Sequence, residues 1–226
     1  MLFRNVKSII FDLDDTLIPS SRYYPLAVAM VLQPDKNWKA DWSIARSRVK
    51  ADLPNEHTSA RNRLLYFKAY LEYRSDTERA AIDLYEKYEA ELSRLIIAQA
   101  EEKRRFLVEL SKSFNLYVLT NETTRAQLAK IKALTSGNTK IFAGIVTSEE
   151  VGFEKPSIKI FETLMRRYQL VSSECLFVGD SITNDLEPAS ALGMYVLHTT
   201  EFCDTPIIET GYARINELTQ LRSLIP

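Results

Sequence analysis

The sequence has little of what marks several large classes of protein. Its 226 residues include only two cysteines, which argues against a disulfide-stabilised secreted domain and makes a reducing cytoplasm the expected location. Lys and Arg number 29 against 30 for Asp and Glu, so the net charge of −1 offers no electrostatic basis for binding nucleic acid. The N-terminus has no signal-like apolar region, and no apolar run is long enough to span a bilayer. We therefore expect neither nucleic acid nor a membrane as a partner.

The composition is that of an ordinary globular protein, with 46% hydrophobic and 26% charged residues. The length suits one large domain, or one domain with a smaller insert. Histidine is scarce as well. His57 and His198 are not paired in the sequence, and we interpret each as a surface or packed residue rather than a metal ligand. Nothing in the sequence indicates the oligomeric state.

Short apolar segments predict the strands of a sheet, at residues 8–11, 116–119, 144–147, 176–178 and 195–197. Amphipathic helical patterns separate most of them. One such helix is predicted over 125–134, with Leu128, Ile131 and Leu134 on its buried face, and another over 157–168. Strands without polar alternation, separated by helices, are typical of a parallel sheet buried on both faces. The predicted fold is therefore α/β, a Rossmann-like parallel sheet with helices on both faces.

An insertion separates the first two predicted strands by about a hundred residues, which is far more than one crossover helix needs. Helical patterns fill it at 40–51, 59–73 and 77–95, and a fourth at 102–112 is assigned to the sheet domain. The sequence thus predicts a core domain of residues 1–19 and 98–226 with an all-helical domain of residues 20–97. Prolines punctuate the early part of the insertion, at positions 19, 25, 34 and 54. Tyr66, Tyr70 and Tyr73 share one helical face and are interpreted as packing between helices, although they could also floor a substrate pocket.

Two acidic residues follow the first strand directly, in the segment Asp12-Leu13-Asp14-Asp15-Thr16. In open α/β sheets, ligands bind beyond the carboxyl ends of the strands. Carboxylates crowded at such a position repel one another unless a proton or a cation joins them. Mg²⁺ is the natural partner, because it prefers a few protein oxygens and several waters. The alternative is an acidic turn with solvated side chains.

A second acidic segment, residues 179–185, follows the strand at 176–178. Gly179 permits a tight turn or a close approach of the backbone. Asp180 could complete a Mg²⁺ site begun by Asp12. Asp185 could hold a metal-bound water or orient Lys155. Either aspartate could instead cap the following helix.

Cationic and hydrogen-bonding side chains follow two other strands. Pro156 is predicted to be the first residue of the helix over 157–168, which places Lys155 near a helix N-terminus, where anions bind well. Thr120 and Asn121 follow the strand at 116–119, and their hydroxyl and amide groups could donate hydrogen bonds to phosphate oxygens. Either of these two residues could instead be an ordinary helix N-cap.

Together these segments resemble the haloacid dehalogenase superfamily of phosphohydrolases. Residues 12–16 match its first motif, Thr120 the second, Lys155 the third, and Gly179-Asp180 through Asp185 the acidic fourth. Their order and strand context agree along essentially the whole chain. The insertion resembles the helical cap of members that carry an insert after the first motif.

The resemblance implies a Mg²⁺-dependent phosphatase that hydrolyses a small phosphorylated metabolite through an aspartyl-phosphate. Asp12 would be the nucleophile and a metal ligand. Asp14 would be the general acid and then the base, with its backbone carbonyl on the metal. Thr120 and Lys155, with Asn121 beside them, would hold the phosphoryl oxygens, Asp180 would bind the metal, and Asp185 would support the site. Because Asp14 must be protonated in the first step, we expect its pKa to be raised.

Other functions remain open at this stage. A phosphomutase would share these residues and return the phosphoryl group to the substrate. Dehalogenation is less compatible, because halide departure needs no proton from Asp14. A phospho-receiver domain would be much shorter, with its acceptor aspartate after the third strand. A non-catalytic binding protein on this fold is disfavoured by the presence of both Asp12 and Asp14.

Overall fold

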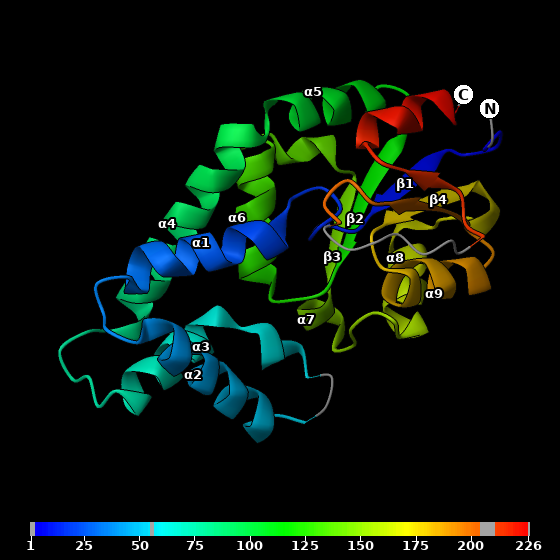
Figure 1. The fold of residues 1–226 in the computed structure, drawn as a ribbon. Helices are drawn as coiled ribbons and strands as arrows, with labels where there is room; N and C mark the ends of the chain where they lie inside the picture. Colours follow the sequence, from blue (N-terminus) through cyan, green and yellow to red (C-terminus); the bar gives the residue numbers. More distant parts are fainter. Residues whose placement is uncertain (1–2, 55–56, 204–210, 226) are drawn as a thin grey trace.

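A computed structural model describes residues 3–54, 57–203 and 211–225 of the protein, and its centre is a six-stranded sheet (Figure 1). The strands lie in the order β3-β2-β1-β4-β5-β6 and all neighbouring pairs are parallel. Their bounds are β1 Ser8–Phe11, β2 Asn115–Thr120, β3 Gly144–Thr147, β4 Cys175–Gly179, β5 Tyr195–Thr199 and β6 Arg214–Ile215. The predicted parallel α/β sheet is confirmed. The sixth strand was missed because two residues show no periodicity.

The register of β1 determines where the chemistry lies. Phe11 pairs with Val118 of β2 on one side and with Val178 of β4 on the other. The residues that follow these three strands therefore emerge at one edge of the sheet. They include Asp12 from β1 and Asp180 from β4.

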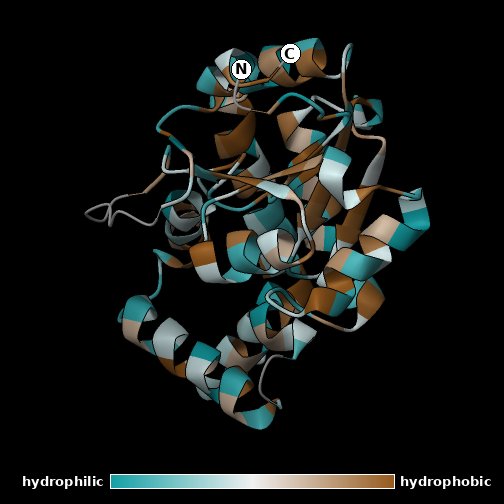
Figure 2. Cartoon of the chain, turned by 90° about the vertical axis from the view of Figure 1, so that its right-hand side faces the viewer, coloured by the Kyte–Doolittle hydropathy of each residue, from teal (hydrophilic) through white to brown (hydrophobic). Residues whose placement is uncertain are grey.

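Hydrophobic cores cover both faces of the sheet. Ile9 and Phe11 belong to one buried cluster, whereas Ile10, between them, belongs to another. Since side chains alternate between the faces of a strand, both faces are dry. The second cluster is covered by α8 (Ile158–Tyr168) and α9 (Glu187–Ala191), and the first by α5 (Glu101–Leu110) and α6 (Thr124–Leu134). Figure 2 shows the apolar strands between these helices.

The segment between β1 and β2 is helical, as predicted. It contains α1 Ser20–Leu32, α2 Trp38–Asp52, a short 3₁₀ turn Thr58–Arg61, α3 Arg63–Tyr73 and α4 Ala81–Gln99. Two details differ from the predictions. Helix α1 forms despite Pro25 in its interior, and the helix expected over 59–73 is interrupted at Asn62, whose side chain accepts a hydrogen bond from the Leu64 backbone at 3.0 Å and begins α3. The division into domains at 19/20 and 97/98 stays a prediction.

The inserted helices differ in how they meet the core. Helix α4 lies along α6 and packs against α1, while α2 and α3 form the far end (Figure 1). One hydrophobic cluster continues from the sheet through Ile131 of α6 to Leu92 of α4. Apolar contacts therefore fix the base of the insertion. The same cluster reaches Trp42 of α2 and Phe67 of α3 at the far end.

An aromatic group holds α2 and α3 together. Trp42 lies 4.8 Å from Phe67 and 5.8 Å from Tyr66, measured between ring centroids. Tyr70 is also buried there, whereas Tyr73 is 38% exposed. The expectation that these tyrosines pack between helices holds for Tyr66 and Tyr70 and is wrong for Tyr73. In the described ranges, no helix has both the length and the apolar character needed to cross a membrane.

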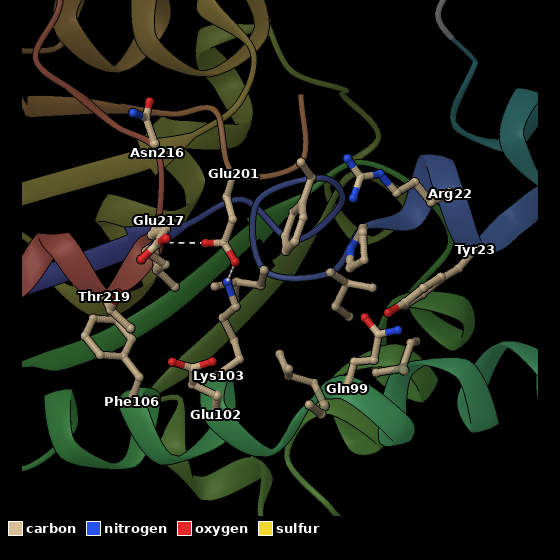
Figure 3. A pocket seen from close by; sticks show the side chains of 18 residues that line it. Arg22, Tyr23, Gln99, Glu102, Lys103, Phe106, Glu201, Asn216, Glu217 and Thr219 are labelled. Atoms are coloured by element: carbon tan, nitrogen blue, oxygen red, sulfur yellow. Dashed lines mark hydrogen bonds and ion pairs between the residues drawn. The ribbon is translucent and has the colours of Figure 1, made fainter. Parts of the chain in front are cut away.

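A cavity of about 530 Å³ lies where the two connections of the insertion meet the C-terminal segment (Figure 3). Its wall includes Arg22 and Tyr23 from the first turn of α1 and Gln99, the last residue of α4. Lys103 contacts Glu201 at 2.5 Å, and the other oxygen of Glu201 accepts from the Leu218 backbone at 2.7 Å. None of the predicted site residues lines this cavity.

Phe67→Ala should lower the free energy of unfolding by about 3–5 kcal/mol, because it removes a fully buried ring from the contact between α2 and α3. Chemical denaturation measures this. Phe153→Ala, at a ring that is 41% exposed, is the matched control and should change stability far less. Equal losses in the two variants would contradict the assigned packing.

Candidate active site

Lys155 joins two buried carboxylates. Its Nζ lies 2.6 Å from Oδ1 of Asp12 and 2.6 Å from Oδ1 of Asp185, and all three side chains are buried. Burial alone would lower the pKa of Lys155, but the two carboxylates outweigh it and raise the pKa well above its ordinary value. The ammonium group therefore stays charged in the interior of the protein.

Carboxylate oxygens of Asp12, Asp180 and Asp185 gather within 4.8 Å of one another. Burial raises the pKa of Asp12 well above its usual range despite Lys155, and Asp185 and Asp180 add to the effect. Burial and the nearby Asp185 also raise the pKa of Asp180 to about 7. When ionised, the three carboxylates exceed the charge of Lys155 by two negative charges. The donor set, all oxygen with this excess charge, fits one divalent cation such as Mg²⁺.

The turn after β4 brings Asp185 into this group. A Cβ on Gly179 would lie 2.5 Å from Oδ2 of Asp185, so only glycine allows the carboxylate to approach the strand end this closely. The same carboxylate accepts from the Ser181 backbone at 3.2 Å. Neither Asp180 nor Asp185 is a helix N-cap, because Ser181 is the N-cap of the helical turn Ile182–Leu186 and Leu186 is that of α9. His198 is packed here, as expected, with Nε2 3.0 Å from the backbone oxygen of Asp180.

The Asn121 side chain contacts the backbone of the Lys155 loop. Its side-chain amide donates to the backbone oxygen of Lys155 at 3.0 Å and accepts from the backbone nitrogen of Lys155 at 2.8 Å. The side chain thereby positions the Lys155 loop, and its contact with a phosphate stays a prediction. Pro156 differs from expectation, because α8 begins at Ile158 with Ser157 as its N-cap.

Thr120 and Asp14 are linked through Gln127. Nε2 of Gln127 lies 2.7 Å from Oγ1 of Thr120 and 2.9 Å from Oδ2 of Asp14. Thr120 is buried at the end of β2 and donates only a long 3.3 Å hydrogen bond, to the Asn121 backbone oxygen. Its hydroxyl proton is therefore available for a stronger acceptor.

The expectation of a raised pKa for Asp14 is wrong for this conformation. Burial acts in that direction, but the ammonium of Lys130, 2.5 Å from Oδ1, together with hydrogen bonds from Gln127 and Ser20, holds the pKa well below its usual range. Tyr24 donates a further hydrogen bond to Oδ1 at 3.1 Å. Asp14 is thus an ionised, paired carboxylate here.

Lys130 and Gln127 were missed because the helix was oriented incorrectly from its apolar residues. Leu128, expected on the buried face, is 43% exposed, whereas Lys130 is 2% exposed and Gln127 is fully buried. The buried face of α6 is polar at these positions because it faces Asp14. The available signal was the spacing of Gln127, Lys130 and Leu134, which places them on one helix face, but apolar periodicity gives no weight to polar residues.

Side chains from the insertion reach the same network. Arg63 of α3 pairs with Glu122, which follows β2. The Tyr24 hydroxyl of α1 lies 3.1 Å from Oε2 of Glu122 and accepts a hydrogen bond from Lys130 at 2.6 Å. A second contact across the two parts joins Arg61 to Glu154 at 3.6 Å. Asp14 is therefore connected to the inserted helices by a continuous polar network.

A cavity of about 550 Å³ opens from Asp14 and Asp15 toward the inserted helices. Its wall includes Trp38, Trp42 and Arg46 of α2 together with Tyr66 of α3. The volume lies in the range of small-molecule sites. Of the predicted site residues, only Asp14 lines this cavity, which therefore gives a small molecule room beside Asp14.

Comparison with known proteins agrees with this geometry. The model of the haloacid dehalogenase-like hydrolase family matches residues 6–193, and the chain belongs to this family. It is 31% identical to a ribulose-1,5-bisphosphate 5-phosphatase of Halopiger xanaduensis, over 83% of this chain and 82% of that protein. It is 28% identical to a glyceraldehyde 3-phosphate phosphatase of Methanocaldococcus jannaschii, over 97% of each chain.

Solved structures show the same fold. The HAD-hydrolase YfnB of Bacillus subtilis, described as bound to magnesium and as revealing interdomain movement, superposes with a TM-score of 0.68 over 97% of this chain and 99% of that one, at 22% identity. The predicted superfamily and the predicted enzyme class, a phosphatase, are confirmed.

The Asp14 pair should make stability depend on pH in acid. Because the folded-state pKa is lowered, the pair contributes stability above the ordinary pKa of 3.8 and loses it as the pH falls below that value. The difference in unfolding free energy between wild type and Asp14→Asn should stay constant above about pH 5 and shrink below about pH 4. Denaturant titrations across this range measure it. A difference that stays constant or widens toward pH 3 would contradict the assignment.

Proposed function

We propose that this phosphatase hydrolyses a small phosphorylated metabolite with Mg²⁺ as cofactor, through an aspartyl-phosphate on Asp12. The observation that carries the proposal is the Lys155 ammonium between Asp12 and Asp185, beside an acidic group that suits a divalent cation. Phosphoryl transfer depends mainly on positioning and on charge neutralisation, and this group of side chains offers both. The phosphatases among the relatives support hydrolysis over a mutase reaction.

In the proposed site, Asp12, Asp180 and the backbone carbonyl of Asp14 would hold Mg²⁺, which would neutralise the phosphate and keep Asp12 ionised. Lys155 contributes positive charge next to the nucleophile and remains protonated throughout. Thr120 donates its hydroxyl proton to a phosphoryl oxygen, with its orientation fixed by Gln127. Asn121 and Asp185 position Lys155 through its backbone and its ammonium group, respectively.

Asp12 attacks phosphorus, and the bond from phosphorus to the ester oxygen breaks. Asp14 gives its proton to the leaving oxygen and then takes a proton from the water that attacks the aspartyl-phosphate. Splitting one difficult hydrolysis into two steps lowers the barrier. Asp14 must leave its pair with Lys130 before it can carry that first proton, because the pair keeps it ionised.

Substitution of the two aspartates should separate the two steps. Asp12→Asn should abolish turnover and form no adduct. Asp14→Asn keeps the nucleophile, so an aryl phosphate with a good leaving group should still phosphorylate Asp12, while hydrolysis slows by about 10²–10⁴-fold. Intact-protein mass spectrometry should show a phosphoryl adduct on Asp14→Asn alone. Near wild-type turnover by both variants would refute the mechanism.

Metal removal should abolish phosphate release, and added Mg²⁺ should restore it. Mg²⁺ should also raise the melting temperature of the wild type, because an ion that binds only the folded state stabilises it. Asp180→Asn should weaken both effects. Asp15→Asn is the control, because the Asp15 carboxylate accepts hydrogen bonds from Ser21, and this variant should retain both the activation and the stabilisation by Mg²⁺. Full activity in excess chelator would overturn the role of the metal.

A further inference from the structure

The cavity beside Asp14 has walls of different charge. Three acidic residues lie at its core end: Asp14 pairs with Lys130 and Glu122 with Arg63, while Asp15 accepts hydrogen bonds from Ser21. Across the cavity, Lys39, Arg46 and Lys50 of α2 also line the wall. Within the part of the chain that the structure describes, none of these three cations has a carboxylate partner. The α2 wall therefore carries surplus positive charge.

Helix geometry aims this wall at the cavity. Trp38, Trp42, Arg46 and Lys50 recur every fourth residue, so they share one face of α2, and all four line the cavity. Arg46 is also positioned from the other side, because its guanidinium lies 5.7 Å from the centre of the Tyr66 ring. Exposed cations on a helix are usually no more than a solvated face. Arg46 and Lys50, however, line the cavity beside Asp14.

We propose that this cavity binds the leaving group of the substrate, and that the leaving group carries a second anionic group, a carboxylate or a phosphate, held by Arg46 and Lys50. The inference rests on the proposed function and names its substrate class. The reacting phosphate would lie at the core end with Asp12 and Lys155, and the second anion at the α2 end. An arginine and a lysine suit a carboxylate or phosphate through charge-assisted hydrogen bonds.

Matched substrates test the class. 3-Phosphoglycerate and glycerol 3-phosphate differ in a carboxylate at the far end, and fructose 1,6-bisphosphate and fructose 6-phosphate differ in a second phosphate. In at least one pair, the wild type should have the higher kcat/KM for the compound with the second anionic group, which is 3-phosphoglycerate or fructose 1,6-bisphosphate. A preference in the first pair identifies a carboxylate, and a preference in the second identifies a phosphate. Equal kcat/KM within both pairs would overturn the inference.

Charge-removing variants test the residues. Arg46→Gln and the double variant Arg46→Gln/Lys50→Gln should lower kcat/KM for the favoured substrate on the order of 10- to 100-fold, mostly through KM, which is the scale of a lost charge-assisted hydrogen bond. Hydrolysis of 4-nitrophenyl phosphate, whose leaving group carries no second acid, should change little. Arg48→Gln is the control, because Arg48 is on α2 but lies over the Tyr73 ring and outside this cavity.

The outcomes separate the two proposals. If wild type and variants hydrolyse the aryl phosphate alike, and the variants also keep full activity on the favoured substrate, the anion subsite is wrong and the phosphatase mechanism stands. If wild type releases no phosphate from any of these compounds, the proposed function fails, and the inference fails with it.

Discussion

The site depends on one buried cation. Lys155 is enclosed with Asp12 and Asp185, and without its charge the three carboxylates at this edge of the sheet would stand uncompensated. A buried charge without a partner is strongly destabilising, so this ammonium is required by the fold as well as by the proposed reaction. The features around it follow from this need. Asn121 fixes the backbone of Lys155, and Gly179 leaves room for Asp185.

A second buried cation, Lys130, pairs with Asp14 as Lys155 pairs with Asp12. The difference is that its network includes residues of the inserted helices, Tyr24 and Arg63. Movement of α3 relative to the core would change the surroundings of Glu122 and, through Tyr24 and Lys130, those of Asp14. The protonation of the proposed general acid should therefore depend on the position of α1 and α3, which line the cavity beside Asp14.

Much of this site could be predicted because parallel strands end at one edge of the sheet. Asp12, Lys155, Asp180 and Asp185 were chosen on that ground, and the structure brings them together. Orientation could not be predicted in the same way. The sequence indicated that Asn121 was near the site, but only the packed loop shows that its amide is turned to the Lys155 backbone.

The helices show the same limit. Apolar periodicity placed Leu128 inside and overlooked Lys130, because the interior that α6 faces is polar at that point. No helical pattern was assigned to the residues of α1, in the part of the insertion that prolines punctuate, and the packing of α1 against α4 outweighs the local cost of Pro25. In each case a contact distant in the sequence decided the outcome.

The shared hydrophobic cluster between α4 and α6 has a consequence for engineering the specificity of this enzyme. A graft that replaced residues 20–97 would cut through α4, which continues to Gln99, and would strip the apolar cover from Ile131. The smallest exchangeable unit is instead the α2–α3 hairpin, which carries the cationic wall and leaves α1 and α4 in place. Such an exchange would have to supply matching buried side chains, because Trp42 of α2 and Phe67 of α3 belong to the same hydrophobic cluster as Leu92 of α4.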